Sequence, residues 1–228
     1  MSSGLREYWN ASTARIPDTK VPSRYAIEKQ KLFPLGATVC DLGGGTGSDS
    51  LYFMSHGHNV TLIDIADDAL AAASARAEVD GLQELLDVRQ CDFSKASLPI
   101  EDNQFDVVYA RLALHYFTAD VLRGLISEIY RGLKPLGTAY FTCKSPDDVA
   151  EMAFLASVAD EIEPGVFSHN GYLKTRFTAE QLRGVASSAG VRSENYSVRI
   201  YTEQLSTEND VVASGNTRFI VNEIILRK

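Results

Sequence analysis

The sequence predicts an α/β fold in which helices cover both faces of a mostly parallel sheet. Three observations support this prediction. Short, apolar, β-branched runs alternate with longer helical patterns along most of the chain. A glycine-rich turn follows the first of these runs, as in sheets that bind ligands at their carboxyl edge. The last two runs follow each other without a helical pattern between them, so they are expected to pair antiparallel.

Seven segments have the length and composition of strands. In chain order they are residues 38–42, 59–63, 86–90, 105–109, 138–143, 191–201 and 218–226. A polar loop, residues 202–216, joins the last two of them. The pattern therefore predicts parallel strands followed by a C-terminal antiparallel hairpin.

The helical patterns between these strands carry recognisable end signals. Thr118 is the expected N-cap of the pattern at residues 119–133. Thr178 with Gln181 forms the S/T-x-x-E/Q capping box of the pattern at residues 177–190, and Gly190 is its expected C-cap. Pro146 announces a further helix, since proline is tolerated at the first helical position. The clearest patterns are residues 67–79, 119–133 and 177–190.

The size and charge of the chain count against several classes of protein. Its 228 residues suit one domain with a small additional segment. The chain has 22 Lys and Arg against 30 Asp and Glu, so its net charge of −8 leaves no basic surplus for nucleic-acid phosphates. No apolar run approaches the ~20 residues of a membrane span, and the N-terminal segment lacks the layout of a signal peptide.

The cysteines indicate neither a zinc site nor a disulfide framework. Cys40, Cys91 and Cys143 are odd in number, widely spaced and placed in strand-like runs, where cysteine is usually a small core residue. We therefore expect a reduced, cytoplasmic protein with no metal, no nucleic-acid partner and no membrane association.

The most informative segment is TVCDLGGGTGSDSLYFM, residues 38–54. A strand ends in Asp41, and four glycines then turn the chain into a helix, which lets a ligand approach the backbone closely. The strict G-x-G-x-x-G dinucleotide fingerprint fails, because its third glycine falls on Ser48 or Ser50. This failure counts against a nicotinamide oxidoreductase. The alternative for the glycines alone is a tight turn of an α/β protein.

Acidic residues follow the next two strands. Asp64 ends the second strand, where a carboxylate can accept two hydrogen bonds from a ribose diol, with Ile65 beside it for a base. Asp92 and Phe93 end the third strand and offer an acceptor and an apolar surface. As alternatives, both acids cap the segments that follow them, and Ile65 and Phe93 belong to the core.

Taken together, VCDLGGGTG, LIDIA, CDF, FDVVYARLALHYF and RGLKPLGTAYFTCKS resemble the class I S-adenosylmethionine-dependent methyltransferases of small-molecule type. These motifs occur in the family's order over about residues 35–145. The resemblance implies a Rossmann-like, doubly wound, three-layer α/β/α fold. Its seven-stranded sheet would be mostly parallel, with an antiparallel C-terminal strand.

The resemblance also implies S-adenosylmethionine as cofactor and assigns positions around it. Asp64 would hold the ribose, Ile65 and Phe93 would flank the adenine, and Asp92 would meet its amine. Arg111 would lie near the sulfonium or the carboxylate of the cofactor; its alternative is an ion pair with a surface acid. The methionine portion would lie against Asp41, Gly43, Gly44, Gly45 and Gly47.

The acceptor is expected to be a small molecule. Ala110–Arg111–Leu112–Ala113 replaces the (Asn/Asp/Ser)-Pro-Pro-(Tyr/Phe) run of amine- and glutamine-modifying relatives. His115 is the candidate general base, because the unperturbed pKa of a histidine lies near neutrality; its alternative is a packing role. The resemblance divides the chain into a cap (1–34), a cofactor core (35–145), a substrate lid (146–176) and a C-terminal helix with hairpin (177–228). The candidate substrate residues are Tyr8, Trp9, Tyr116, His169 and Tyr172.

Two readings stay open beside an active methyltransferase. One is a catalytically inactive protein that binds S-adenosylmethionine and serves as a partner or regulatory subunit. The other is a different enzyme on the same scaffold, such as the nicotinamide oxidoreductase. The expected state is a monomer or a homodimer.

Overall fold

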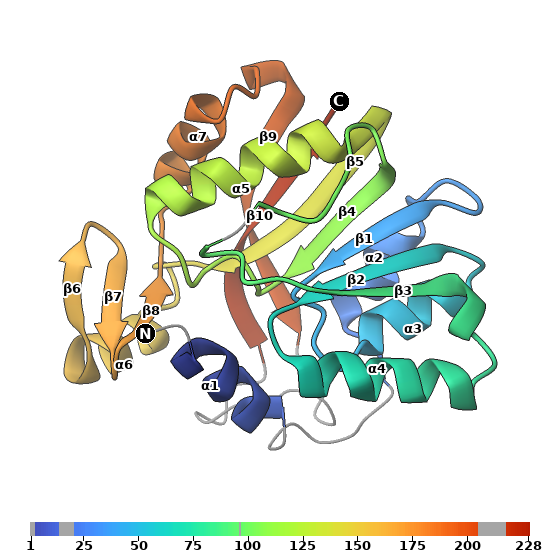
Figure 1. Ribbon diagram of the computed structural model, residues 1–228. Helices are drawn as coiled ribbons and strands as arrows, with labels where there is room; N and C mark the ends of the chain where they lie inside the picture. The colour runs from blue at the N-terminus through green and yellow to red at the C-terminus, as the bar shows by residue number, and fades with distance from the viewer. Residues whose placement is uncertain (1–2, 14–20, 96, 205–217) are drawn as a thin grey trace.

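A seven-stranded sheet in the order β3-β2-β1-β4-β5-β10-β9 forms the centre of the computed structural model, which describes residues 3–13, 21–95, 97–204 and 218–228 (Figure 1). Only β10 runs antiparallel, to β5 on one side and to β9 on the other. The strands are β1 Thr38–Leu42, β2 Asn59–Asp64, β3 Leu86–Gln90, β4 Phe105–Arg111, β5 Leu133–Lys144, β9 Tyr196–Gln204 and β10 Arg218–Arg227. The expected mostly parallel sheet with an antiparallel C-terminal strand is therefore confirmed.

Two strand starts differ from the sequence prediction, and β2, β4, β5, β9 and β10 end one to three residues later than predicted. Strand β5 begins at Leu133 rather than 138, because Leu133 pairs with Phe105 before an irregularity in the β4–β5 register. Strand β9 begins at Tyr196 rather than 191, because a short 3-10 helix, η2 Ser193–Asn195, precedes it. Most of the predicted polar loop 202–216 lies outside the described residues.

Helices cover both faces of the sheet (Figure 1). Helices α2, α3 and α4 lie on one face, and α5 and α7 lie on the other. Thr118 caps α5, and Thr178 with Gln181 forms the capping box of α7, as predicted. Gly190 follows the C-cap of α7 with a left-handed φ of 85°. The bounds are α2 Arg24–Gln30, α3 Ser48–Ser55, α4 Asp67–Val79, η1 Gln83–Leu85, α5 Ala119–Gly132 and α7 Ala179–Ser188.

The core is divided by the sheet into two buried apolar layers. Leu122 and Ile126 of α5 belong to one layer, and Phe53 and Met54 of α3 belong to the other. This division follows from the strands, whose alternate side chains face opposite layers. All three cysteines are buried and free, as expected for core residues.

Described parts of the two segments outside the strand–helix alternation lie together at the carboxyl edge of the parallel strands (Figure 1), whereas α2, which belongs to the first segment, packs on a face of the sheet. The first contains α1, Ser3–Thr13. The second contains α6, Val149–Val158, and a small antiparallel sheet of β6 Asp160–Glu163, β7 Val166–His169 and β8 Tyr172–Thr175. Tyr8 of α1 contacts Tyr172 of β8, with 4.1 Å between ring centroids.

The start of α6 corrects the prediction for Pro146. The helix begins at Val149, and Asp148 is its N-cap, accepting a hydrogen bond from the N–H of Glu151 at 3.1 Å. Pro146 therefore lies in the preceding turn, since the Asp148 cap satisfies the first turn of the helix. In the part of the chain that the structure describes, no helix is long and apolar enough to cross a membrane.

Candidate functional site

The glycine-rich loop between β1 and α3 forms one wall of the candidate site. Gly43, Gly45 and Gly47 have φ angles of 70°, 56° and 78°, a left-handed conformation that glycine adopts readily. The N–H of Gly43 donates to the carbonyl of Ile63 at 2.7 Å, which ties the loop to the end of β2. Gly47 is the N-cap of α3. The loop is thus held at the point where the strand order reverses, between β1 and β4.

Three of the four glycines are required by the packing of the protein itself. A Cβ atom on Gly43 would lie 2.5 Å from the Cβ of Ala113, and one on Gly44 would lie 2.4 Å from a carboxylate oxygen of Asp41. A Cβ on Gly47 would lie 2.9 Å from the Cβ of Ala73. A Cβ on Gly45 would meet no protein atom within 4 Å. Gly45 is therefore the glycine of this loop that leaves space for a ligand.

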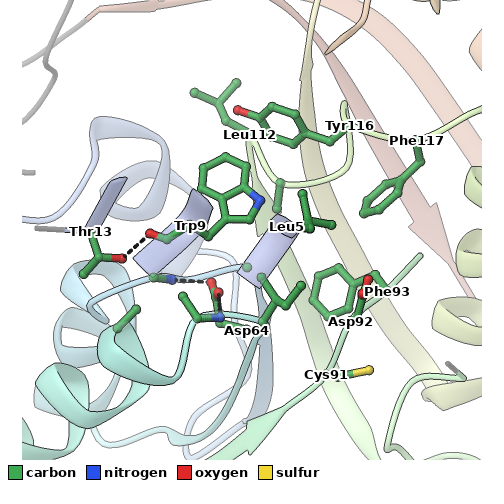
Figure 2. A pocket seen from close by; sticks show the side chains of 16 residues that line it. Leu5, Trp9, Thr13, Asp64, Cys91, Asp92, Phe93, Leu112, Tyr116 and Phe117 are labelled. Carbon is green, nitrogen blue, oxygen red and sulfur yellow. Dashed lines mark hydrogen bonds between the residues drawn. The ribbon is translucent and has the colours of Figure 1, made fainter. Parts of the chain in front are cut away.

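A pocket opens in front of this loop, between α1 and the carboxyl ends of β1 to β4 (Figure 2). Its walls come from five separate segments of the chain. The lining residues are Leu5, Trp9, Thr13, Gly43, Gly45, Asp64, Ile65, Ala66, Ala69, Cys91, Asp92, Phe93, Leu112, Ala113, Tyr116 and Phe117. The lining is mostly apolar with a few polar groups, which is typical of sites for small molecules.

Asp64 supplies a carboxylate to this pocket at the end of β2. One of its oxygens accepts from the N–H of Gly45 at 3.0 Å and the other from the N–H of Ala66 at 2.9 Å. Burial raises the pKa of Asp64, although these backbone bonds oppose the shift. An ionised carboxylate has about four acceptor positions, so positions remain for a diol. Asp64 therefore combines the two roles that the sequence left open, since it stabilises the turn after β2 and also lines the pocket.

Asp92 also lines the pocket and has a structural role. It accepts from the N–H of Ser94 at 3.0 Å and from the ammonium of Lys95 at 2.7 Å. Partial burial alone would raise the pKa of Asp92, but the bonds from Lys95 and Ser94 bring it below its ordinary value. The neighbouring Phe93 ring faces the pocket (Figure 2) and lies 6.4 Å from the Phe117 ring, centroid to centroid.

Asp41 lies beneath the glycine loop and does not line the pocket. Its side chain is 1% exposed and accepts from the hydroxyl of Ser50 at 2.7 Å. Burial raises the pKa of Asp41 to about 8, and the Ser50 bond opposes this shift. Like Gly44 and Gly47, which also lie outside the pocket lining, Asp41 supports the loop from within the protein.

Arg111 points toward the end of β9 and does not line the pocket. Its Nε donates to Glu203 at 2.7 Å, and Glu203 is completely buried. This ion pair corresponds to the alternative given for Arg111, except that the acid is buried rather than at the surface. The partners are 92 positions apart in the sequence.

His115 is buried behind the pocket rather than in its wall. The imidazole is 2% exposed, and its centroid lies 4.3 Å from that of the Tyr116 ring, which does line the pocket. Burial, followed by the charges of Arg176, Lys144 and Lys174, lowers the pKa of His115 well below its ordinary value. The imidazole is therefore neutral at pH 7, and its place favours the packing alternative.

Aromatic side chains from both lid segments meet above the pocket. Trp9 of α1 contacts Tyr116 at 4.9 Å and Tyr8 at 5.2 Å between ring centroids. Figure 2 shows the Trp9 and Tyr116 rings on one side of the pocket. Tyr8 in turn contacts Tyr172. Tyr8, Tyr172 and His169, which pairs with Tyr172 across the β7–β8 hairpin, lie outside the pocket lining. Four of the five predicted substrate residues are thus brought together.

The sequence did not identify several lining residues. Leu5 and Thr13 flank Trp9 at intervals of four, so the helical spacing of α1 was an available signal. Leu112, Ala113 and Phe117 follow β4 without a signal beyond their position after a strand. Among the described residues, no group of three His, Cys, Asp or Glu side chains is placed to hold a metal ion.

Comparison with known proteins gives consistent results. The family model described as "Methyltransferase domain" matches residues 40–141. A malonyl-[acyl-carrier protein] O-methyltransferase of Enterobacter lignolyticus is 31% identical over 55% of this chain and 46% of its own length. A sterol 24-C-methyltransferase of Gibberella zeae is 39% identical over 45% of this chain and 26% of its own length.

Solved structures share the fold over nearly the whole chain. A methyltransferase of Methanosarcina mazei superposes with a TM-score of 0.70 at 20% identity, covering 91% of this chain and 99% of its own. A Burkholderia thailandensis 1,6-didemethyltoxoflavin-N1-methyltransferase, solved with that compound and S-adenosylhomocysteine, has a TM-score of 0.66 at 17% identity. It covers 100% of this chain and 88% of its own. By contrast, the chain spans less than half the length of the first curated relatives, 46% and 43%.

Proposed function

We propose that this chain is a class I S-adenosylmethionine-dependent methyltransferase that transfers a methyl group from S-adenosylmethionine to a small-molecule acceptor, a proposal supported by the methyltransferase family model over residues 40–141. The observation that supports this most directly is the pocket at the strand-order reversal. There Gly45 leaves open space and Asp64 retains acceptor positions. A cofactor with a ribose diol and a net positive charge fits both features.

The cofactor assignments follow the pocket. Asp64 would hold the ribose, with Ile65 and Phe93 against the adenine, and Asp92 would meet the adenine amine while still holding Ser94 and Lys95. Gly43 and Gly45 would lie along the methionine portion. Asp41, Gly44 and Gly47 would hold the conformation of the loop. Arg111 would pair with Glu203 and would not contact the cofactor.

The chemistry requires positioning above all. The bound cofactor supplies an electrophilic methyl group on a sulfonium, and displacement is in line with the acceptor atom. Much of the acceleration comes from holding the reactants in near-attack geometry. We propose that Trp9 and Tyr116 form the wall against which the acceptor lies, with Tyr8 and Tyr172 closing it from outside. Water would then be excluded by α1, acting as the cap, and by the segment 146–176, acting as the lid.

The role of His115 stays a prediction. Its neutral imidazole can accept a proton, but contact with the pocket runs through the Tyr116 ring. A base is needed only where the acceptor atom carries a proton. Relatives named for O-, N- and C-methylation match this chain, so any of these atoms is compatible with the family. We propose a cytoplasmic monomer or homodimer, consistent with three buried free thiols.

Titration calorimetry tests the cofactor. We expect S-adenosylmethionine and S-adenosylhomocysteine to bind, and NADH not to bind. The Asp64→Asn variant keeps an oxygen for the backbone N–H groups but loses the charge, so we expect affinity to fall about tenfold or more. Asp102→Asn is the control, because Asp102 is exposed and pairs with Arg131. Binding of NADH alone, or unchanged affinity in Asp64→Asn, would contradict the proposal.

Turnover is a separate question from binding. Transfer of a radiolabelled methyl group to small molecules of a cell extract would support the enzyme. Tight cofactor binding without any transfer would instead favour the inactive cofactor-binding partner.

A further inference from the structure

Three basic side chains gather behind the aromatic wall of the pocket. Lys144 lies at the carboxyl end of β5, and Lys174 and Arg176 lie on β8 and directly after it. Arg176 donates to Glu151 of α6 and, at 2.9 Å, to the carbonyl of Thr175. Lys144 lies 3.0 Å from the other oxygen of Glu151. These four side chains, called here the basic cluster, join α6, β5 and β8.

The basic cluster carries more positive charge than its own acid balances. Glu151 pairs with both Lys144 and Arg176, while Lys174 has no hydrogen bond or ion pair within the described part of the chain. The carboxylate of Asp148 also attracts Lys144 electrostatically, but its side chain accepts a hydrogen bond as the N-cap of α6. Burial lowers the pKa of Lys144 and of Lys174, and the charge of Arg176 contributes to both shifts. Three cations therefore share one directly paired carboxylate.

Buried polar atoms beside the cluster also lack partners. The Nε of Arg176 and the Nδ1 of His115 form no hydrogen bond among the described residues, although these side chains are only 3% and 2% exposed. Buried polar groups are nearly always hydrogen-bonded, so two such atoms at one place require an explanation. An anionic oxygen group would accept from the guanidinium and from a neutral imidazole N–H.

The loop after β4 connects the basic cluster to the pocket. His115 faces the cluster, and the adjacent Tyr116 lines the pocket. Thr175, next to Arg176, donates its N–H to the carbonyl of His115 at 2.8 Å and its hydroxyl to that of Phe117 at 2.5 Å. The cluster is therefore held directly behind the residues that face the reacting groups.

We propose that the methyl acceptor carries an anionic oxygen group, a carboxylate or a phosphate, that binds to the basic cluster at Lys174. Arg176 and His115 would contribute buried positive potential and a donor there, and the rest of the acceptor would lie along Trp9 and Tyr116. This inference rests on the proposed function and narrows its acceptor. A cationic acceptor would meet repulsion from three like charges.

Small aromatic probes test the charge requirement, because the wall is aromatic. Benzoate, phenyl phosphate, benzyl alcohol and benzylamine are titrated by NMR into the full chain, with and without S-adenosylhomocysteine. We expect benzoate or phenyl phosphate to bind about tenfold more tightly than the neutral and cationic probes. The comparison of the two anions identifies the oxygen group. Preference for benzylamine, or no preference for anions, would overturn the proposal.

Variants of Lys174 locate the site, because its ammonium makes no hydrogen bond or ion pair among the described residues and contacts the Phe154 ring of α6 at 5.8 Å from the centroid. We expect Lys174→Gln to weaken anion binding about five- to tenfold and Lys174→Arg to restore it. Lys31→Gln is the control, since Lys31 is exposed at the end of α2. Unchanged anion binding in Lys174→Gln would overturn the proposal. Failure of S-adenosylhomocysteine to bind would contradict the proposed function alone, because anion binding is also measured without it.

Discussion

Gly45 offers a way to separate backbone strain from loss of ligand space. Its φ of 56° is left-handed, and a Cβ there would meet no protein atom within 4 Å. Gly36 has nearly the same conformation, with φ of 63°, and equally open surroundings, but it lies exposed between α2 and β1. The variants Gly45→Ala and Gly36→Ala therefore carry the same strain. They differ in that Gly45 lines the pocket.

The expected effects on stability are equal and modest. A left-handed alanine costs about 1–2 kcal/mol. For a domain of this size, 1 kcal/mol lowers Tm by about 2–4 °C, so each variant should melt about 2–8 °C lower than the wild type. Gly44→Ala is a third comparison, because its φ is not left-handed, yet its Cβ would lie 2.5 Å from Leu62 and 2.4 Å from Asp41. We expect overpacking there to cost about 1–3 kcal/mol.

The expected effects on binding are different. The added methyl group of Gly45→Ala occupies space that the cofactor needs, so we expect the affinity for S-adenosylhomocysteine to fall about tenfold or more, equivalent to about 1.4 kcal/mol. Gly36→Ala should bind like the wild type. Calorimetry measures the affinities of the variants, and thermal unfolding measures their stabilities. Wild-type affinity in a folded Gly45→Ala variant would refute the placement of the cofactor against Gly45.

Three further outcomes are expected. Trp9 is the only tryptophan and lines the pocket, so S-adenosylhomocysteine should change its fluorescence emission in the wild type; an unchanged spectrum despite binding would contradict this placement. Burial gives Asp41 a pKa of about 8, above the ~4 of an unfolded chain, so this group's contribution favours folding less as pH rises from about 4 to 8. The free energy of unfolding of Asp41→Asn, relative to that of the wild type, should therefore rise by up to about 1.4 kcal/mol per pH unit between pH 5.5 and 7.5, as measured by denaturant unfolding. A difference that does not change with pH would refute the raised pKa of Asp41. Thr178→Ala removes the capping box of α7 and should cost about 1 kcal/mol without changing cofactor affinity.

The parts of the fold that sequence reasoning predicted well depend on local signals. Helix α4 has the predicted bounds, and the caps at Thr118 and Thr178 form as expected, because each involves residues within one turn. The position of the glycine loop after β1 was also predictable. The reason for its individual glycines was not, since the atoms that exclude a Cβ at Gly43 and Gly47 come from distant segments.

The features of the site that could not be predicted from the sequence depend mostly on ion pairs between residues far apart in the chain. Arg111 carried two readings, and its pairing with Glu203 depends on β9 lying close to the end of β4. The basic cluster likewise arises because β8 returns to the end of β5, which brings Arg176 and Lys144 to Glu151. No periodicity or motif in residues 144–176 indicates that meeting.

The distribution of charge within the site adds to what the total charge of −8 indicates. Asp64 and Asp92 line the pocket at the ends of β2 and β3, where we propose a cofactor with a net positive charge. Lys174 and Arg176 lie near the buried His115, next to Tyr116 in the chain, where we propose an anionic acceptor. Because opposite potentials then act on the two reactants, each is attracted to its own side and repelled from the other. Under these proposals, the charges that bind the reactants also orient the methyl group toward the acceptor.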